Sequence, residues 1–141
     1  MTRVDFYVLQ TGSRGNRYTL AVRLAEKAWN AGHRILIATD NREQLHHMNR
    51  LLWTYRDQNF IPHGLLGEAD PVLNPVLLTD GTDPADEHDV LINLRTEIPE
   101  CFSRFERVAE CVDQEQVELC RDHYRFYQNC GYQLATHKIT D

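Results

Sequence analysis

Short apolar runs alternate along the chain with longer stretches in which apolar side chains recur every three or four residues. The short runs are typical of buried strands and fall at residues 4–9, 33–38, 75–79, 89–94 and 107–112. The helical spacing covers residues 18–31, 40–52 and 113–131, and a shorter helix is expected at 98–105. Residues 132–136 are expected to add a last edge strand, whereas residues 53–74 show no clear period and are expected to be irregular.

Helix-end signals support this division of the chain. Asp40 and Glu43 form a D-x-x-E capping signal, and Asp113 is an N-cap candidate with Gln116 three residues later. Gly131 stands where a helix-ending residue with positive φ is expected. Strands that alternate with helices imply right-handed βαβ units on a mostly parallel sheet. The prediction is an α/β protein with one three-layer, Rossmann-like domain over residues 1–141 and helices on both faces of the sheet.

In the helix predicted at 113–131, arginines border one edge of the apolar face. Its apolar arc collects Val117, Leu119, Cys120, Tyr124, Phe126, Tyr127 and Cys130. Beside Val117 and Tyr124, at spacings of three and four residues, lie Arg121, Arg125 and Gln128. An aromatic ring flanked by two guanidiniums can hold a group that is both apolar and anionic. The simpler interpretation is an amphipathic helix with solvated arginines.

Composition narrows the classes of function. The chain has 141 residues, a net charge of −6 and a pI of about 5.6, which disfavours direct, sequence-specific binding to nucleic acid. No segment approaches the length of a membrane span, and the N-terminus opens into a strand rather than a signal peptide, so a cytoplasmic protein is expected. The four cysteines show neither a C-x-x-C pair nor a matching histidine set. They are interpreted as reduced core residues, with no metal and no cofactor expected.

The first predicted strand–helix loop suggests a second hypothesis. Residues 11–17 contain Gly12 and Gly15, at the place where open α/β sheets bind ligands. The loop lacks the third glycine of G-x-G-x-x-G and has no G-K-[ST]. A small nucleotide-binding α/β protein that uses the Gly12/Gly15 loop is therefore the alternative function.

Other chemistry finds little support in the sequence. Neither a G-x-S-x-G elbow nor an H-E-x-x-H motif is present, so no catalytic residue is predicted. An acidic loop holds Asp80, Asp83, Asp86 and Glu87, and it does not follow the EF-hand spacing. These four carboxylates are expected to be solvated.

Two aromatic residues, Trp53 and Phe60, lie in the irregular region. They are either anchors of the local core or anchors for a partner, and core burial is favoured for Trp53.

Several short sequence segments follow one another in an order that resembles a known protein family. They are DFYVL at 5–9, AWNAG at 28–32, RILIA at 34–38, LW at 52–53, FIPH at 60–63, DVLINL at 89–94, RDHYRFY at 121–127 and GY at 131–132. In this order they resemble the chi subunit of bacterial DNA polymerase III, an accessory protein of the clamp-loader complex. The resemblance covers essentially the whole chain.

The resemblance implies a Rossmann-like fold without catalytic activity of its own. Its implied partners are the psi subunit, which tethers chi to the clamp loader, and the acidic, aromatic-ended C-terminal tail of single-stranded-DNA-binding protein. Positions that match the family's tail-binding residues are Arg121, Tyr124 and Arg125, with Val112 on the preceding strand. The surface that faces psi is similar to the segment around Trp53 and Phe60.

Overall fold

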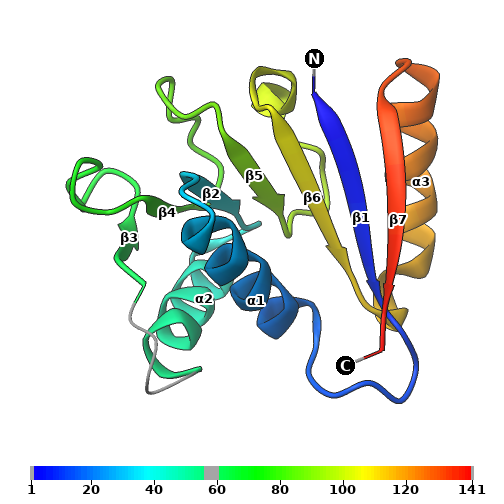
Figure 1. Cartoon of the computed structure of the whole chain (residues 1–141), viewed down its shortest axis with the longest axis horizontal. Helices are drawn as coiled ribbons and strands as arrows, with labels where there is room; N and C mark the ends of the chain where they lie inside the picture. Colours follow the sequence, from blue (N-terminus) through cyan, green and yellow to red (C-terminus); the bar gives the residue numbers. More distant parts are fainter. Residues whose placement is uncertain (1, 56–60, 141) are drawn as a thin grey trace.

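The computed structural model describes residues 2–55 and 61–140, so Phe60 lies outside the described residues. Its centre is one seven-stranded sheet with the order β3-β4-β2-β5-β6-β1-β7, in which every pair of neighbours is parallel (Figure 1). The strands are β1 (Arg3–Leu9), β2 (Ile35–Ala38), β3 (His63–Leu65), β4 (Val76–Thr79), β5 (Val90–Asn93), β6 (Arg107–Val112) and β7 (Gln133–Ile139). The predicted α/β fold class is confirmed.

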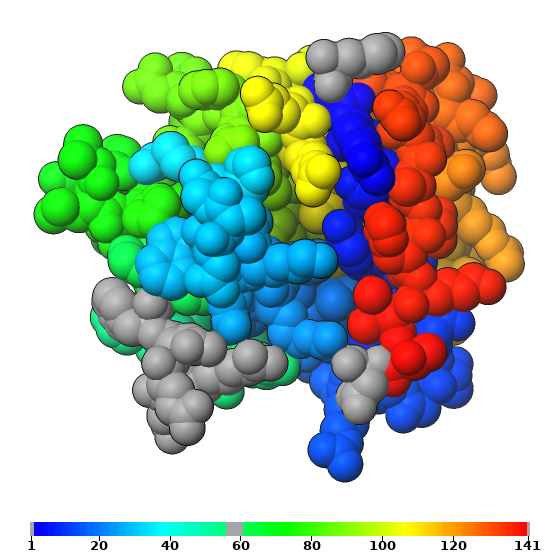
Figure 2. All heavy atoms as spheres, viewed as in Figure 1, coloured from blue at the N-terminus to red at the C-terminus, as the bar shows by residue number. Residues whose placement is uncertain are grey.

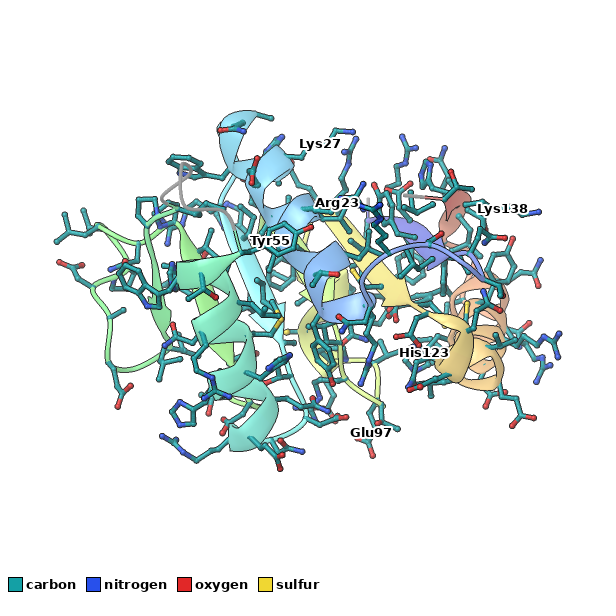
Figure 3. The ribbon with its side chains drawn as sticks, turned by 90° about the horizontal axis from the view of Figure 1, so that it is seen from below. Arg23, Lys27, Tyr55, Glu97, His123 and Lys138 are labelled. Atoms are coloured by element: carbon teal, nitrogen blue, oxygen red, sulfur yellow. The ribbon has the colours of Figure 1, made fainter. Side chains whose placement is uncertain are left out.

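The helices form layers on both sides of this sheet. They are α1 (Arg17–Asn30), α2 (Arg42–Thr54) and α3 (Val117–Asn129), with the 3₁₀ turns η1 (Glu100–Arg104) and η2 (Gln114–Gln116). Side chains of α1 and α2 pack in one buried apolar cluster, and side chains of η1 and α3 pack in a second cluster. Figure 3, the view from below, shows α3 at the end of the molecule opposite to α2.

The direction in which the chain crosses the sheet explains these layers. From β1 to β2 to β3 it moves toward one edge, and from β3 through β4, β5 and β6 to β7 it moves back to the other edge. Right-handed crossovers place connections of opposite direction on opposite faces, so α1 and α2 share one face while η1 and α3 share the other. In Figure 2, β7 and part of β1 reach the surface beside α1.

Two predicted helix N-caps differ from those in the structure: one is displaced by one residue, and the other caps a short turn before its helix. The N-cap of α2 is Asn41, whose Oδ1 accepts a hydrogen bond from the Gln44 backbone at 2.9 Å. Asp40 instead accepts bonds from the backbone N and the Oγ1 of Thr96, at 2.9 and 2.8 Å. Asp113 caps only the short η2 turn, and Gln116 contributes no side-chain cap where α3 begins.

The remaining elements differ from the prediction in length and type. His63–Leu65 forms a short edge strand inside the region expected to be irregular, and β7 extends well beyond residue 136. The predicted helix at 98–105 is the 3₁₀ turn η1. None of the described helices is both long enough and apolar enough to cross a membrane.

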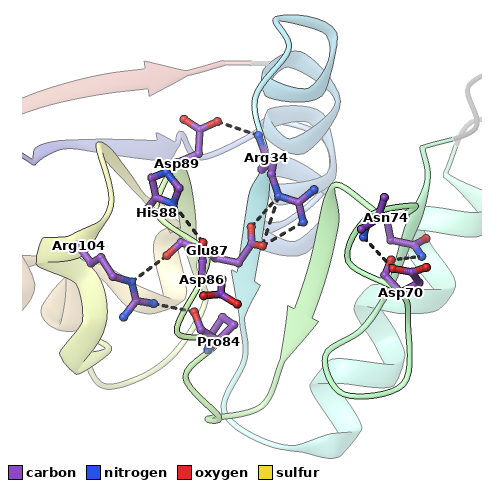
Figure 4. A network of polar contacts seen from close by, with 10 residues as sticks. Arg34, Asp70, Asn74, Pro84, Asp86, Glu87, His88, Asp89 and Arg104 are labelled. Atoms are coloured by element: carbon purple, nitrogen blue, oxygen red, sulfur yellow. Dashed lines mark hydrogen bonds and ion pairs between the residues drawn. The ribbon is translucent and has the colours of Figure 1, made fainter.

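The expectation that all four carboxylates of the acidic loop are solvated was wrong, because one of them is buried. Glu87 faces Arg34, with Nε 3.2 Å from Oε1 and Nη2 3.0 Å from Oε2, as Figure 4 shows. Arg104 donates to the Glu87 carbonyl oxygen and, at 2.7 Å, to the carboxylate of Asp83. Glu87 is therefore a structural ion-pair partner, while Asp83 remains exposed.

We expect Glu87→Ala to lower the free energy of unfolding by about 2 kcal/mol, because it removes a buried carboxylate that accepts three charge-assisted hydrogen bonds from Arg34. Asp83→Ala is the matched control and should cost less than about 1 kcal/mol, because exposed ion pairs contribute little. Urea unfolding of the two variants measures the difference. Equal losses would contradict the structural role of Glu87.

Candidate functional site

Helix α3 lies alongside β7 at one edge of the sheet (Figure 1). It buries Tyr127 and His123 and half-buries Tyr124, whose ring centroid is 5.3 Å from that of Phe6. The predicted apolar arc is only partly correct. Phe126 is 44% exposed and Cys130 is exposed, while the polar His123 is buried in their place.

Five of the predicted site residues share one face of this helix. Val117, Arg121, Tyr124, Arg125 and Gln128, which we call the α3 surface, follow one another at spacings of four, three, one and three. Val117 and Tyr124 are half-buried, whereas the two arginines and the glutamine are exposed. The helix therefore places an apolar strip beside two accessible guanidiniums.

Val112 lies apart from this exposed set. It is the last residue of β6, is 4% exposed and belongs to the buried cluster against which Tyr124 packs. Its buried position gives it a supporting place beneath the α3 surface rather than a place on it.

Both arginines of the α3 surface are accessible to an anion. Arg125 lies 3.7 Å from Asp122, and both side chains are largely exposed, so this pair is weak. Among the described residues, Arg121 has neither a side-chain hydrogen bond nor an ion pair. An incoming carboxylate can therefore bind either guanidinium without breaking a strong internal contact.

A buried polar network fixes α3 on the sheet. Glu110 of β6 accepts hydrogen bonds from Tyr127 Oη at 2.8 Å and from Asn93 Nδ2 at 2.9 Å. Its other oxygen is 3.0 Å from His123 Nδ1, and His123 Nε2 is 2.8 Å from the Thr96 carbonyl oxygen. His123, labelled in Figure 3, comes from the helix and directly precedes Tyr124, so the network determines where the α3 surface lies.

The imidazole of His123 faces an acceptor at each ring nitrogen. A carbonyl oxygen only accepts, and a carboxylate accepts when ionised, so the geometry favours the doubly protonated ring. Burial lowers the pKa of His123, but the hydrogen bond and the charge of Glu110 outweigh this effect and raise the pKa above 6.5. Burial and the same carboxylate raise the pKa of Tyr127, which stays a neutral donor.

The sequence prediction missed this network, although it contained two signals. Glu110 interrupts the apolar run of β6, and His123 lies on the buried side of the helical period, four residues before Tyr127. What the sequence lacked was the pairing across the two elements.

We expect His123→Gln to lower the free energy of unfolding by about 2 kcal/mol at pH 6, because it removes a buried, charged donor from Glu110. Because the pKa of His123 is higher in the folded chain than in the unfolded chain, its protonation stabilises the fold fully below pH 6.5. This contribution is lost as the pH rises through the folded-state pKa. The stability difference from the unchanged chain should therefore shrink as the pH rises above 6.5 in thermal unfolding. His88→Ala, at an exposed histidine, is the control; a pH-independent difference would contradict the assignment.

The Gly12/Gly15 loop is already closed by the chain itself. Asn16 Oδ1 accepts from the backbone N–H groups of Tyr18 and Thr19, and Asp113 Oδ2 accepts from that of Arg17 at 3.3 Å. The crevice of about 470 Å³ beside the loop thus presents a carboxylate where a phosphate group would approach the start of α1. This arrangement disfavours a nucleotide at that place.

Trp53 is 56% exposed, so the expected core burial was wrong. Its ring centroid lies 4.8 Å from that of His63, at the edge of the sheet formed by β3. The side chain therefore lies on the surface beside the edge strand β3, and Figure 1 shows β3 and α3 at opposite ends of the sheet.

Comparison with known proteins identifies the family. The family model described as "DNA polymerase III chi subunit, HolC" matches residues 1–135. A protein named DNA polymerase III subunit chi from Pseudomonas aeruginosa is 40% identical over 141 residues, covering 99% of this chain and 98% of that protein. The protein of the same name from Escherichia coli is 28% identical over 143 residues, covering 96% of this chain and 97% of its own. The chain belongs to the chi-subunit family of DNA polymerase III, and its place is that of an accessory subunit of the replicative polymerase complex.

Proposed function

We propose that this chi-family protein is a non-catalytic adaptor between the clamp loader and single strands coated with single-stranded-DNA-binding protein. The α3 surface binds the acidic, aromatic-ended C-terminal tail of that protein. A separate surface around Trp53 and Phe60 binds the psi subunit, which connects the adaptor to the clamp loader. The observation that carries the proposal is the half-buried Tyr124 beside the exposed side chains of Arg121 and Arg125 on one face of α3.

The chemistry of the α3 surface matches such a tail in two respects. One arginine pairs with the terminal carboxylate in a fork contact, and the other attracts the preceding acidic side chains. Tyr124 and Val117 provide apolar area for the terminal aromatic ring, and the packing of Tyr124 on Phe6 holds the ring in position. Gln128 adds a polar side chain one turn beyond Tyr124.

An exposed site of this kind supports modest affinity. The guanidiniums stay hydrated when free, so part of each ionic contact is offset by lost solvation. We expect a dissociation constant on the order of micromolar, equivalent to about −8 kcal/mol, that weakens with added salt.

The psi surface rests on the exposure of Trp53. A large aromatic side chain at the surface is an unusual use of apolar area and is typical of an interface anchor. Val72 and Leu73 are also exposed and apolar, and they lie in the loop between β3 and β4, the two strands at the same edge of the sheet. Phe60 is part of this proposal by resemblance alone.

We expect Arg121→Ala and Tyr124→Ala each to weaken binding of the tail peptide at least about tenfold, because each removes a charge-assisted or aromatic contact from a small site. Isothermal titration calorimetry with a synthetic tail peptide measures the affinity. Arg50→Ala, at an exposed arginine of α2, is the matched control and should bind as the unchanged chain does. Unaltered affinity in both α3 variants, with folding intact by circular dichroism, would remove the site assignment.

We expect Trp53→Ala to reduce co-purification with the psi subunit while leaving affinity for the tail peptide unchanged. The physical reason is that Trp53 and the α3 surface lie at opposite ends of the sheet and share no side chain. Co-expression with tagged psi, followed by the same calorimetric titration, separates the two activities. Loss of both activities would instead indicate a folding defect, and retention of psi would exclude Trp53 from the interface.

A further inference from the structure

A cavity of about 260 Å³ lies at the carboxyl ends of three neighbouring strands, β4, β2 and β5. Leu36, Ala38 and Leu91 of the sheet lie at its apolar floor with almost no exposed surface, and its walls are the loops at 79–83 and 95–101. The half-buried Ile98, Pro99 and Cys101 add accessible apolar area to this lining. The cavity shares no residue with the α3 surface or with Trp53.

The topology marks this place as one where a ligand is expected. After β2 the chain turns into α2 on one face of the sheet, whereas the connections after β4 and β5 cross the other face. Adjacent strands whose connections diverge in this way leave a crevice beyond their carboxyl ends, where open α/β sheets bind ligands.

Arg95 is the cation of this cavity, and its backbone is firmly held. Its N–H donates to Asn93 Oδ1 at 3.0 Å, and the next residue, Thr96, is held by two hydrogen bonds to Asp40. The guanidinium reaches across to Gly81, where a Cβ atom would come within 3.0 Å of Nη1. A glycine at position 81 thus leaves space for the guanidinium.

The Nε–H group of Arg95 is unsatisfied, unlike the Nε–H groups of Arg34 and Arg104. Its Nε is buried and has no hydrogen-bond partner among the described residues, which also give it no ion pair. Arg34 and Arg104, by contrast, both donate to Glu87 (Figure 4), and Arg104 also donates to Asp83. A buried N–H group without an acceptor is unfavourable, so an oxygen ligand would be stabilised there.

The surroundings select the kind of anion. Asp83, Glu97 and Glu100 lie on the rim, where Glu97 extends into solvent (Figure 3), and they would repel a doubly charged anion more strongly than a singly charged one. A guanidinium pairs with a carboxylate through two parallel hydrogen bonds, and the apolar floor accepts a short alkyl chain. We propose that the β4-β2-β5 cavity is a binding site for a small carboxylate with a short apolar body, held by Arg95.

The test is an NMR titration of the full chain with sodium butyrate, observing the Arg95 Nε–H signal and the methyl groups of Leu36 and Leu91. We expect saturable shifts with butyrate, and binding of the uncharged isostere butyramide at least about tenfold weaker because it lacks the ionic contact. Sodium chloride at the same ionic strength should give no saturable shift. Equal binding of butyramide, or tighter binding of inorganic phosphate than of butyrate, would overturn the assignment.

Variants separate a binding role from a structural one. Arg95→Ala should weaken butyrate binding at least about tenfold, and Arg95→Lys should restore part of it, because lysine keeps the charge but not the planar fork. Arg50→Ala should leave binding unchanged. Thermal unfolding confirms that each variant is folded, and butyrate binding by a folded Arg95→Ala variant at the original affinity would refute the proposal.

The same carboxylate chemistry can come from a free small molecule or from an acidic side chain of a partner protein. N-acetylglutamate amide, which presents a side-chain carboxylate on a peptide-like body, distinguishes the two sources. Binding of butyrate alone assigns the cavity to a small molecule, and equal or tighter binding of the glutamate compound assigns it to a partner's side chain. Binding of neither compound would refute the site.

Discussion

The carboxylate of Glu110 is the interaction on which the arrangement of this molecule depends. It lies in the middle of β6, in a position that an apolar residue would normally fill, and gathers three donors from β5 and α3. A buried charge is tolerated only when it is fully hydrogen-bonded, so these donors must return to the same positions each time the chain folds. Apolar packing alone would permit α3 to slide or rotate on the sheet. The polar network fixes both its height and its rotation, and thereby the direction in which Tyr124 and the neighbouring arginines point.

The order of strands adds a second constraint. Because the chain moves first toward β3 and then back toward β7, the two outermost strands come from distant parts of the sequence. The two edges of the sheet therefore carry different elements and side chains. One carries Trp53 and the short strand β3, and the other carries β7 with the partly uncovered α3. A single sheet therefore presents two unlike surfaces that are separated by five intervening strands.

Local patterns in the sequence predicted the strands and helices well, because burial on both faces of a parallel sheet requires nearly continuous apolar runs. The failures occurred where a tertiary contact decided the outcome. Asp40 and Asn41 are both good caps, and only the distant Thr96 shows why Asn41 takes that role. The burial of Glu87 likewise depends on Arg34, which is far away in the sequence. Trp53 was expected in the core but is exposed, because helix periodicity does not reveal that α2 lies near a sheet edge. The α3 surface followed from helix spacing, whereas the network beneath it required the pairing of β6 with α3.

The distance between Trp53 and α3 has a kinetic consequence within the proposed function. A protein anchored through one surface holds the other at a high effective concentration near its target, so a brief, weak contact is enough to keep the two assemblies together. The two surfaces lie at opposite ends of the sheet and share no side chain, so we expect occupancy of one to leave the affinity of the other unchanged. Such an adaptor releases and recaptures successive tails quickly while its anchor stays in place, which suits a polymerase complex that moves along DNA.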